Sequence, residues 1–493
     1  MPFAWNLPFL CIFLTMVMAI LLSVIPGAKT AFWLTVAVSA FCAAASLVFL
    51  AAVIRADTAF SFTMGKFTAP FGNEIRGGPL QGLLVTAFST VMCLSLLGGR
   101  EELLADVVDR KVGLACVMLS MVLASLQVLT YTNDIFTAYV FIEISTISAC
   151  ALVMIKDSGP TLVATVRYLF MSLLGSGLFL FGVVLLYCVT GHLLMPQLAE
   201  TVAKLTAAGE YRTVLALSLG MMTAGLGVKS AMFPFHRWLP DAHGTATTTS
   251  SAVLSGLVLK GYAVLMILLF SRVFSLETVR SLHTNEIVLA LGFSGMIFGS
   301  VRAMRETHAK RMLAYSSVAQ LGYVFMGIGM GTKAGMAAAC FQILAHAFTK
   351  PLLFISVGKL SATAGHDKQF AALRGSAWKA PLAGLGFGIG ALSMVGIPLF
   401  GGFAAKTGFA LSAVSGSYTW GVLLVLALSS VLNALYYLPA LIAIWRDRPM
   451  RSEREKRDLT FSAAVLLLSA GILFLGVCFR PVMDIIVRGL ELL

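Results

Sequence analysis

Four lysines and one glutamate lie inside stretches of this chain that are otherwise almost entirely apolar. The lysines are Lys229, Lys260, Lys350 and Lys406, and the glutamate is Glu143 in TAYVFIEISTISACALVM. A charge near the centre of a bilayer costs at least ~2.5–3.5 kcal/mol, so such residues usually face a protein or water interior and pair there. Burial favours the neutral form of both groups, which suits each of them to take up and release protons. One glutamate and several lysines in one membrane therefore indicate an ion path.

A histidine adds to this set. His346 and Lys350, in QILAHAFTKPLLF, are four residues apart and so share one face of a helix. A neutral histidine relays protons well because its unperturbed pKa is about 6.5, although a core histidine with ordinary partners is the alternative. For the lysines the alternative is snorkelling, in which the charged end reaches the membrane surface. The snorkelling alternative is weakest for Lys260, the deepest of the four lysines. For Glu143 the alternative is a structural carboxylate.

Other polar residues receive no assigned role. His236 and His243 flank RWLPDA after the seventh apolar span, with Asp241 between them. These three residues either gate the path, contact a neighbouring subunit or form a solvated loop. The eight cysteines are scattered singly, without a CxxC motif or a Cys/His cluster. We therefore expect no iron–sulfur cluster, zinc site, other metal or cofactor in this chain.

Composition places the chain in a membrane. Of its 493 residues 59% are hydrophobic and only 12% are charged, and its mean hydropathy is +0.92. A soluble domain has about 25% charged residues, so the sequence predicts an all-α polytopic protein of the cell inner (plasma) membrane. The net charge of +13 is not accompanied by a basic stripe with interleaved aromatic residues, which argues against nucleic acid as a partner.

Taking about 20 apolar residues for each span predicts about fourteen transmembrane helices. The expected spans are 5–25, 31–54, 80–98, 112–131, 134–155, 163–190, 211–233, 246–271, 285–302, 311–330, 335–360, 382–406, 410–445 and 460–480. Outside the four intramembrane lysines, roughly 21 Lys and Arg residues fall in the loops after odd-numbered spans, against roughly 10 in the others. The positive-inside rule places the richest of these loops, 302–311 and 446–458, in the cytoplasm and both termini outside.

Two of the expected spans are interrupted by helix-breaking residues. Pro234 follows Lys229 in span 7, and Pro398 and Gly401 precede Lys406 in span 12. Interrupted helices lie against protein or a cavity, and matching breaks in two halves point to an inverted-repeat transporter core. Ordinary proline kinks are the alternative.

The breaks divide the chain into units. The expected division is an N-terminal part, 1–111, followed by two inverted five-helix repeats of helices 4–8 and 9–13, at 112–272 and 285–445. A cytoplasmic loop and a last helix, 446–493, complete the chain.

Several long motifs together carry a resemblance to a known family. TNDIFTAYVFIEISTISACALV, GLGVKSAMFPFHRWLPDAHGTATTTSSAVLSGLVLKGY, RMLAYSSVAQLGYVFMGIG, LAHAFTKPLLFISVGKL and GIPLFGGFAAK occur in this order between residues 70 and 440. They resemble the antiporter-like subunits of respiratory complex I and of Mrp-type cation/proton antiporters. Lys406 favours the Mrp D-type and complex-I N-type pattern, and the run YVFIEI resembles Mrp D or the corresponding subunit of membrane-bound hydrogenases.

The resemblance implies roles for the buried charges. Glu143 and Lys229 match the pair at the entrance of the family's proton path, and Lys260 matches its central lysine. His346 and Lys350 match a relay in the eleventh helix, and Lys406 matches the residue at the exit. The implied function is a proton-translocating subunit that works with other membrane subunits, with protons and Na⁺ as its ions. We expect a monovalent cation/proton antiporter subunit of the Mrp D type.

Three alternatives stay open at this point. The same residues suit an ion-pumping subunit of a redox-driven complex, such as a membrane-bound hydrogenase or an NADH–quinone oxidoreductase. The buried charges would also be explained by a structural subunit in which they only fix helix packing. A stand-alone carrier of a small organic ion would need an aromatic-lined site near the bilayer midplane. The sequence does not choose between the antiporter and the redox-driven complex.

Overall fold

The computed structural model describes residues 3–63, 67, 72–414, 416–447 and 458–493. Twelve of its helices are long and apolar enough to cross a membrane. The first third of the chain contains η1 (Phe3–Asn6), α1 (Leu7–Leu22), α2 (Ala28–Ala56), β1 (Phe60–Thr63), β2 (Glu74–Gly77), α3 (Pro79–Asp106), α4 (Asp109–Tyr131) and α5 (Ile135–Met154). The two strands pair antiparallel, with Phe60 opposite Gly77, in a hairpin that the sequence analysis did not predict.

The middle of the chain contains the first broken helix and one long helix with two π-helical turns. Its elements are α6 (Gly159–Thr190), α7 (Met195–Ala208), α8 (Arg212–Lys229), η3 (Phe235–Arg237), α9 (Trp238–Thr245), α10 (Thr248–Val253), η4 (Leu254–Val258), α11 (Leu259–Leu268), η5 (Leu269–Val273) and α12 (Ser275–Ser281). The run from α10 to η5 forms one span, and η4 and η5 are its π-helical turns.

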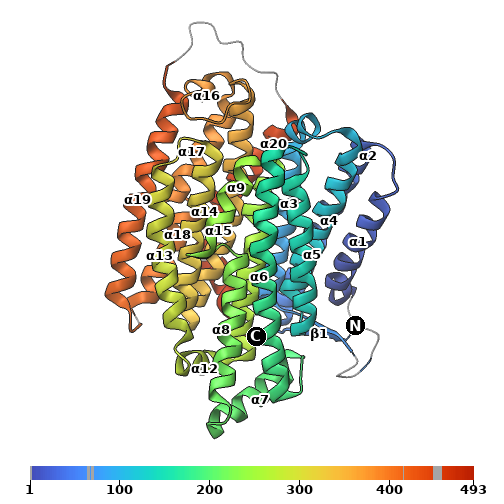
Figure 1. Ribbon diagram of the computed structural model, residues 1–493, viewed down its shortest axis with the longest axis vertical. Helices are drawn as coiled ribbons and strands as arrows, with labels where there is room; N and C mark the ends of the chain where they lie inside the picture. Colours follow the sequence, from blue (N-terminus) through green and yellow to red (C-terminus); the bar gives the residue numbers. More distant parts are fainter. Residues whose placement is uncertain (1–2, 64–66, 68–71, 415, 448–457) are drawn as a thin grey trace.

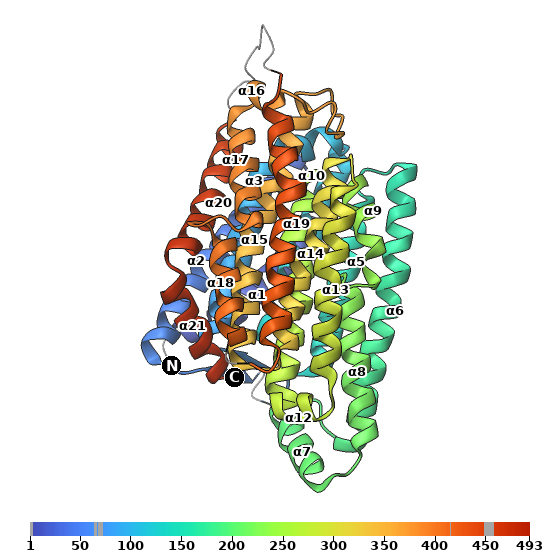
Figure 2. The same ribbon diagram turned by 90° about the vertical axis from the view of Figure 1, so that its left-hand side faces the viewer.

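The last part of the chain contains the second broken helix. Its elements are α13 (Thr284–Met304), α14 (Ala309–Gly329), α15 (Lys333–Ala362), α16 (Ser376–Lys379), α17 (Pro381–Val395), α18 (Gly401–Val414), α19 (Thr419–Trp445), α20 (Leu459–Val477) and α21 (Phe479–Glu491). Both termini lie at the end of the bundle that carries α7 and α12, opposite the end that carries α16 (Figures 1 and 2). We call these the α7 end and the α16 end.

The predicted breaks in spans 7 and 12 are confirmed. α8 ends at Lys229 and the helix resumes in α9, while α17 ends at Val395 and resumes in α18. Backbone angles φ of +54° at Ala231 and +94° at Gly396 turn the chain out of the helix at each break. With these two broken helices, the twelve long spans make the fourteen that the sequence predicts.

The two breaks fall at matching places in opposite directions. α8 and α9 form the fourth helix of the unit α4–η5, and α17 and α18 form the fourth helix of the unit α13–α19. The pair α8–α9 runs from the α7 end toward the α16 end, whereas α17–α18 runs the other way (Figures 1 and 2). This is the arrangement that an inverted repeat requires.

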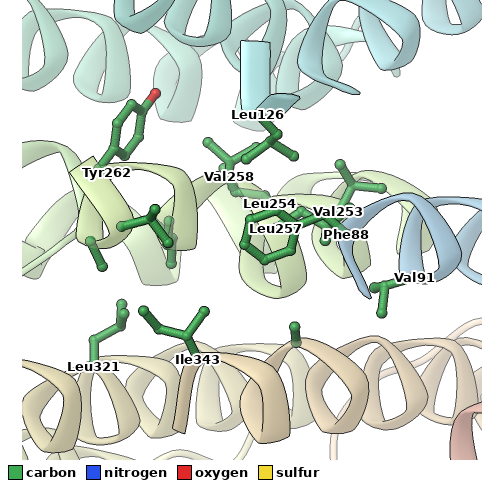
Figure 3. Close-up of a cluster of buried hydrophobic side chains, with 14 of the residues drawn as sticks. Phe88, Val91, Leu126, Val253, Leu254, Leu257, Val258, Tyr262, Leu321 and Ile343 are labelled. Atoms are coloured by element: carbon green, nitrogen blue, oxygen red, sulfur yellow. The ribbon is translucent and has the colours of Figure 1, made fainter. Parts of the chain in front are cut away.

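Three segments form the centre of the bundle: the span Thr248–Val273, α14 and α15. The most apolar stretches of the first two are entirely buried, and that of α15 is almost so. Figure 3 shows why: Leu254, Leu257 and Val258 pack between Leu126 of α4 on one side and Ile343 of α15 on the other. A residue on these three segments is therefore inside protein along the whole membrane thickness.

Three of the expected boundaries are wrong. The thirteenth span, expected at 410–445, starts at Thr419, because α18 continues to Val414. Lys406 consequently lies in the middle of α18 instead of near the end of its span. The last part of the chain holds two helices, since α21 is a separate helix that packs on α3 and α15. Its apolar residues Val482, Ile486 and Leu490 share one face at helical spacing, which a search for spans of about 20 residues overlooks.

Candidate buried-charge path

The first station of the candidate path pairs two helices of the first unit. Lys229, the last residue of α8, is almost completely buried, and its Nζ lies 3.4 Å from Glu143 Oε1 on α5. The same Nζ donates a hydrogen bond of 2.6 Å to Thr146 Oγ1, one turn further along α5. The Glu143 side chain keeps 23% of its surface exposed at the edge of the bundle. The sequence predicts this pair, but nothing in the pattern singles out Thr146.

The second station depends on a π-helical turn. Lys260 is completely buried at the start of α11, and its Nζ donates to the carbonyl oxygen of Ser255, five residues earlier in η4. The wider turn of a π-helix leaves carbonyl groups without their usual i+4 partner, and such turns are frequent at functional sites. The lysine occupies one of these carbonyls. No acidic residue hydrogen-bonds or pairs with Lys260 in the part of the chain that the structure describes.

Two serines bridge Lys260 to the third station. Ser255 Oγ lies 2.7 Å from Ser317 Oγ on α14, and Ser317 Oγ donates a 3.0 Å hydrogen bond to the Leu313 carbonyl. Lys350 Nζ on α15 donates to the same carbonyl at 2.8 Å. The two lysines, ninety residues apart, are thus connected through one short polar bridge that lies wholly inside the protein.

His346 lies between the same two lysines. It is one turn before Lys350 on α15, is completely buried, and neither ring nitrogen has a hydrogen-bond partner. Lys260 and Lys350 are both near enough to act on the charge of its ring. A buried histidine that serves packing alone normally has a partner for each nitrogen. A relay role for His346 therefore stays a prediction, with the ordinary core histidine as its alternative.

The last station is on the second broken helix. Lys406 of α18 donates to the carbonyl oxygens of Val395, at 2.6 Å, and Met394, at 3.4 Å, which the end of α17 leaves free. Its Nζ lies 5.6 Å from the centre of the Tyr323 ring, a cation–π distance. A Cβ atom at Gly396 would come within 2.9 Å of the same Nζ. The break thus both supplies the acceptors and makes room for the lysine.

The six predicted residues fall into three groups that do not all touch. Glu143 and Lys229 form the first group. Lys260, His346 and Lys350 form the second group. Lys406 alone forms the third, in the second broken helix. Among the described residues, Lys229 approaches the central group through Tyr262. Its Nζ lies 6.0 Å from the centre of the Tyr262 ring, and Tyr262 is on α11, the helix that carries Lys260. The geometry suits stepwise proton movement between stations, since each lysine has a neutral oxygen acceptor. Among the described residues, no cluster of three or more His, Cys, Asp or Glu side chains is arranged to hold a metal ion.

The residues around RWLPDA do not form a solvated loop. His243 is completely buried in α9, where its ring stacks on Phe354 at 4.9 Å, and both ring nitrogens lack partners. Asp241 accepts hydrogen bonds from Arg167 at 2.7 Å and from Arg311 at 2.8 Å, which ties α6 to α14. The alternative of a solvated loop is wrong, because α9 turns back into the bundle after the break and carries these side chains with it.

One buried lysine was missed among the loop charges. Lys310, in the basic run RAMRETHAKR, is completely buried at the first turn of α14 and donates to the Ala246 carbonyl at 3.0 Å. Lys260, Lys310 and Lys350 all act on the charge of the His243 ring. A cavity of about 110 Å³, lined by Glu101, Glu102 and Lys359, lies beside this group between α3, α15 and α20 at the α16 end. In the sequence, the only signal for Lys310 is its place directly before the apolar run of α14.

Comparison with known proteins places these features in a family. The family described as "NADH:quinone oxidoreductase/Mrp antiporter, TM" matches residues 132–432. NADH-quinone oxidoreductase subunit N of Desulforudis audaxviator (strain MP104C) is 30% identical, over 91% of this chain and 92% of that protein. A subunit of the membrane-bound sulfane sulfur reductase, an archaeal respiratory membrane complex, superimposes with a TM-score of 0.86 at 26% identity, over 99% of this chain and 96% of its own.

The fold extends to a further type of complex. A chain of the Mrp complex from Dietzia sp. DQ12-45-1b superimposes with a TM-score of 0.89 at 21% identity, covering 100% of this chain and 97% of its own. The resemblance seen in the sequence motifs is confirmed. On the match over residues 132–432 and the similarity to a subunit N along most of its length, this multi-pass membrane protein belongs to the NADH:quinone oxidoreductase/Mrp antiporter family.

Proposed function

We propose that this chain is the proton-translocating subunit of a redox-driven membrane complex. One observation carries the proposal: Lys260 and Lys350 are completely buried on the central helices, and their hydrogen-bond partners among the described residues are neutral oxygen atoms. A lysine without a counter-charge in the membrane interior costs several kcal/mol as a cation, so its proton is held loosely. A purely structural role would be served better by apolar residues of similar size.

The path follows the four stations in turn. Protons reach the pair of Glu143 and Lys229, cross to Lys260, continue along His346 and Lys350, and leave past Lys406. The two units of the chain, 112–272 and 285–445, then each contribute one broken helix with a lysine. Coupling is electrostatic: a change of charge at Glu143 alters how tightly Lys229 holds its proton, and the change passes to the next lysine.

The source of energy is where the proposal departs from our first expectation. The motifs favoured a cation/proton antiporter subunit of the Mrp D type, with the redox-driven complex as the alternative. The similarity to a protein named NADH-quinone oxidoreductase subunit N supports the alternative better. The likeness to the Mrp complex chain, at 21% identity, is a likeness of fold. We therefore assign this chain to a redox-driven assembly and propose protons, not Na⁺, as its ion.

The proposed partners are other membrane subunits. The similar chains come from the multi-subunit complexes that their descriptions name, an archaeal respiratory membrane complex and an Mrp complex. The edge of the bundle at α5 supports such a neighbour, because the Glu143 side chain is partly exposed there at membrane depth. A second protein that covers this edge would remove the carboxylate from lipid. The positive-inside rule places the α16 end, with its basic loops, in the cytoplasm.

The test uses the assembled complex, purified from its native membrane through a tag on this chain. We expect subunits with a flavin or iron–sulfur clusters to co-purify, and inverted vesicles to take up protons only when the electron donor of the complex is added. Lys350→Met should abolish proton uptake while assembly is kept. The matched control is Lys204→Met, which removes an exposed lysine of α7 that pairs with Glu200.

Two outcomes would contradict the proposal. If only small membrane subunits co-purify and proton movement follows added Na⁺ without an electron donor, the antiporter interpretation holds instead. If Lys350→Met pumps as well as the unchanged complex, the buried lysines do not carry protons.

A further inference from the structure

A gap remains in the path between Lys350 and Lys406. Lys350 is on α15 and Lys406 is on α18, and no described hydrogen bond or ion pair joins the two side chains directly. The space between them is occupied by α14 and α19. α19 is otherwise one of the most apolar helices of the chain, and its outer face is exposed where the membrane would be.

The inner face of α19 carries three polar side chains toward this gap. Asn433, Tyr436 and Tyr437 are spaced three and four residues apart, so they share one helix face. Asn433 and Tyr437 are completely buried and Tyr436 is 5% exposed. Phenylalanine would fill the same volume as tyrosine without a hydroxyl that needs a partner in the interior. The two hydroxyls are therefore costly unless they are used.

The hydroxyls form a continuous string that begins at Lys350. Lys350 Nζ donates to Tyr437 Oη at 3.3 Å, and Tyr437 Oη lies 2.7 Å from Ser316 Oγ of α14. Tyr436 Oη lies 3.2 Å from the same Ser316 Oγ. In the Tyr436–Ser316 bond the tyrosine is the donor. Each of the three hydroxyls can both donate and accept a hydrogen bond, which a chain of proton transfers requires.

The string stops at an amide. Tyr436 Oη also donates to Asn433 Oδ1 at 2.5 Å, so its single proton has two acceptors. Asn433 Nδ2 in turn donates to the Met394 carbonyl at 3.4 Å, the carbonyl that also binds Lys406. An amide cannot accept a proton on its oxygen and release one from its nitrogen without becoming an imidic acid. Asn433 thus connects the two lysines by hydrogen bonds but does not pass a proton between them.

We infer that Tyr437, Ser316 and Tyr436 form a hydroxyl relay that carries protons from Lys350 toward Lys406, and that Asn433 orients the end of this relay without carrying a proton itself. This inference rests on the proposed function. In one transfer the Lys350 ammonium gives a proton to Tyr437, and Tyr437 passes its own to Ser316. Tyr436 donates to Ser316 or to Asn433 Oδ1, and when its hydroxyl points to Asn433, Ser316 can pass its own proton to Tyr436. Tyr436 releases its proton to Lys406 through a water molecule. Each oxygen gains one proton and loses one, so the net change is one proton moved from Lys350 to Lys406.

The chain offers matched controls for each relay residue. Tyr168 is buried, stacks on Trp238, and its hydroxyl has no hydrogen-bond partner, so Tyr168→Phe removes a hydroxyl that does no relay work. Ser120 is buried and its hydroxyl bonds only to the Cys116 carbonyl of its own helix, which makes Ser120→Ala the control for Ser316→Ala.

The experiment measures protons moved for each electron transferred by the assembled complex in sealed vesicles, with assembly followed on native gels. We expect Tyr437→Phe, Tyr436→Phe and Ser316→Ala each to lower proton uptake about a hundredfold, the lower end of the range for removal of a proton-transfer group. Assembly and the two control variants should be unchanged. The solvent deuterium isotope effect on uptake should rise in the relay variants, which a packing defect would not produce.

The outcomes separate the inference from the function on which it rests. If the three relay variants pump normally while Lys350→Met does not, the relay is wrong and the proposed function stands. If Lys350→Met also pumps normally, the proposed function itself fails. If Tyr168→Phe loses as much uptake as Tyr437→Phe with assembly intact, loss of any buried tyrosine hydroxyl is harmful and the relay is again overturned.

Discussion

At the scale of single residues, the protein keeps its lysines in the interior by giving them neutral oxygen atoms instead of carboxylates. Lys260, Lys350 and Lys406 each bind a backbone carbonyl, supplied by a π-turn, a neighbouring helix or a helix break. A carboxylate at these distances would hold the proton firmly. Lys229 is the exception, with Glu143 at 3.4 Å, and this is where charge can be coupled.

The proposed role of Lys260 depends on a releasable proton. Lys260→Ala should abolish proton uptake with assembly intact, and Lys260→His should keep part of it. Lys260→Arg should fail as badly as alanine, because arginine keeps its proton with a pKa above 12. Uptake by the assembled complex in vesicles measures this series. An arginine variant as active as the unchanged protein would make Lys260 a fixed structural cation.

Glu143 and Lys229 should behave as one unit. Removing either leaves the other without its partner, a loss that is ~3–5 kcal/mol for fully buried pairs and smaller here because Glu143 is partly exposed. We expect Glu143→Gln and Lys229→Met each to lose most proton uptake, and the double variant to be little worse than either. The double-mutant cycle measures the coupling. Strictly additive losses would show that the two residues work independently.

At the scale of helices, interruptions position the lysines. A regular helix uses its carbonyls in internal hydrogen bonds, and an interruption frees some of them for a side chain. Lys350 is the exception among these lysines, since it shares the Leu313 carbonyl inside the regular helix α14. The π-turn at Leu254–Val258 and the break after α17 each free carbonyls at the depth where a lysine needs them. The breaks are therefore part of the site and not simple kinks.

Gly396 provides a test of the second break. Its φ of +94° is costly for any other residue, by roughly 1–2 kcal/mol, and a Cβ there would press on Lys406. Gly396→Ala should lower the melting temperature of the complex and remove most proton uptake. Gly177→Ala is the control, because a Cβ at that helical position meets nothing within 4 Å. Equal effects of the two substitutions would exclude a special role for the break.

The start of α14 should respond to pH. His308 caps this helix by accepting a hydrogen bond from the Arg311 N–H, and burial, with the charges of Lys310 and Lys368, lowers the pKa of His308 to about 4. When the cap is open, His308 has the unperturbed pKa of about 6.5. Between pH about 4 and about 6.5 the open state therefore binds more protons than the capped state. The cap should therefore be fully stable above pH about 6.5 and weaken as pH falls toward about 4.

Hydrogen exchange of the first turn of α14, corrected for intrinsic rates, checks this prediction. Asparagine also caps helices but does not titrate. His308→Asn should therefore remove the pH dependence of protection. If both proteins lose protection equally between pH 7 and pH 5, the histidine is not its cause.

At the scale of the whole molecule, the charged path crosses the centre of the bundle, but its first residue lies at an edge. Glu143 is partly exposed at membrane depth, whereas Lys260 and Lys350 are completely enclosed. The outer faces of α6 and α19 are apolar, as lipid or a neighbouring subunit requires, with Phe170 and Leu424 prominent among the exposed side chains. Lys260 and Lys350 are thus enclosed by this chain, whereas Glu143 and Lys406, at the two ends of the proposed path, are only partly buried.

The isolated chain should accordingly be inactive. Purified alone and reconstituted into vesicles, it should catalyse little or no exchange of Na⁺ or K⁺ for protons, because nothing changes the charge at Glu143. Dye-reported pH changes after a cation pulse measure the exchange, with the whole complex as the positive control. Robust exchange by the single chain would indicate a stand-alone carrier.

The sequence by itself determined the membrane class, the fourteen spans, the two breaks, the five charges within apolar stretches and His346 beside them. These follow from local composition, because a charge or a helix-breaking proline in hydrocarbon has an unfavourable free energy whichever helices surround it. Only the tertiary structure decided that Lys310 and His243 are buried, that Lys260 and Lys350 share a serine bridge, and that Tyr436 and Tyr437 face the gap before Lys406. Those facts depend on which faces of α9, α14 and α19 meet, and an apolar helix with little amphipathic pattern does not show in its sequence which of its faces turns inward.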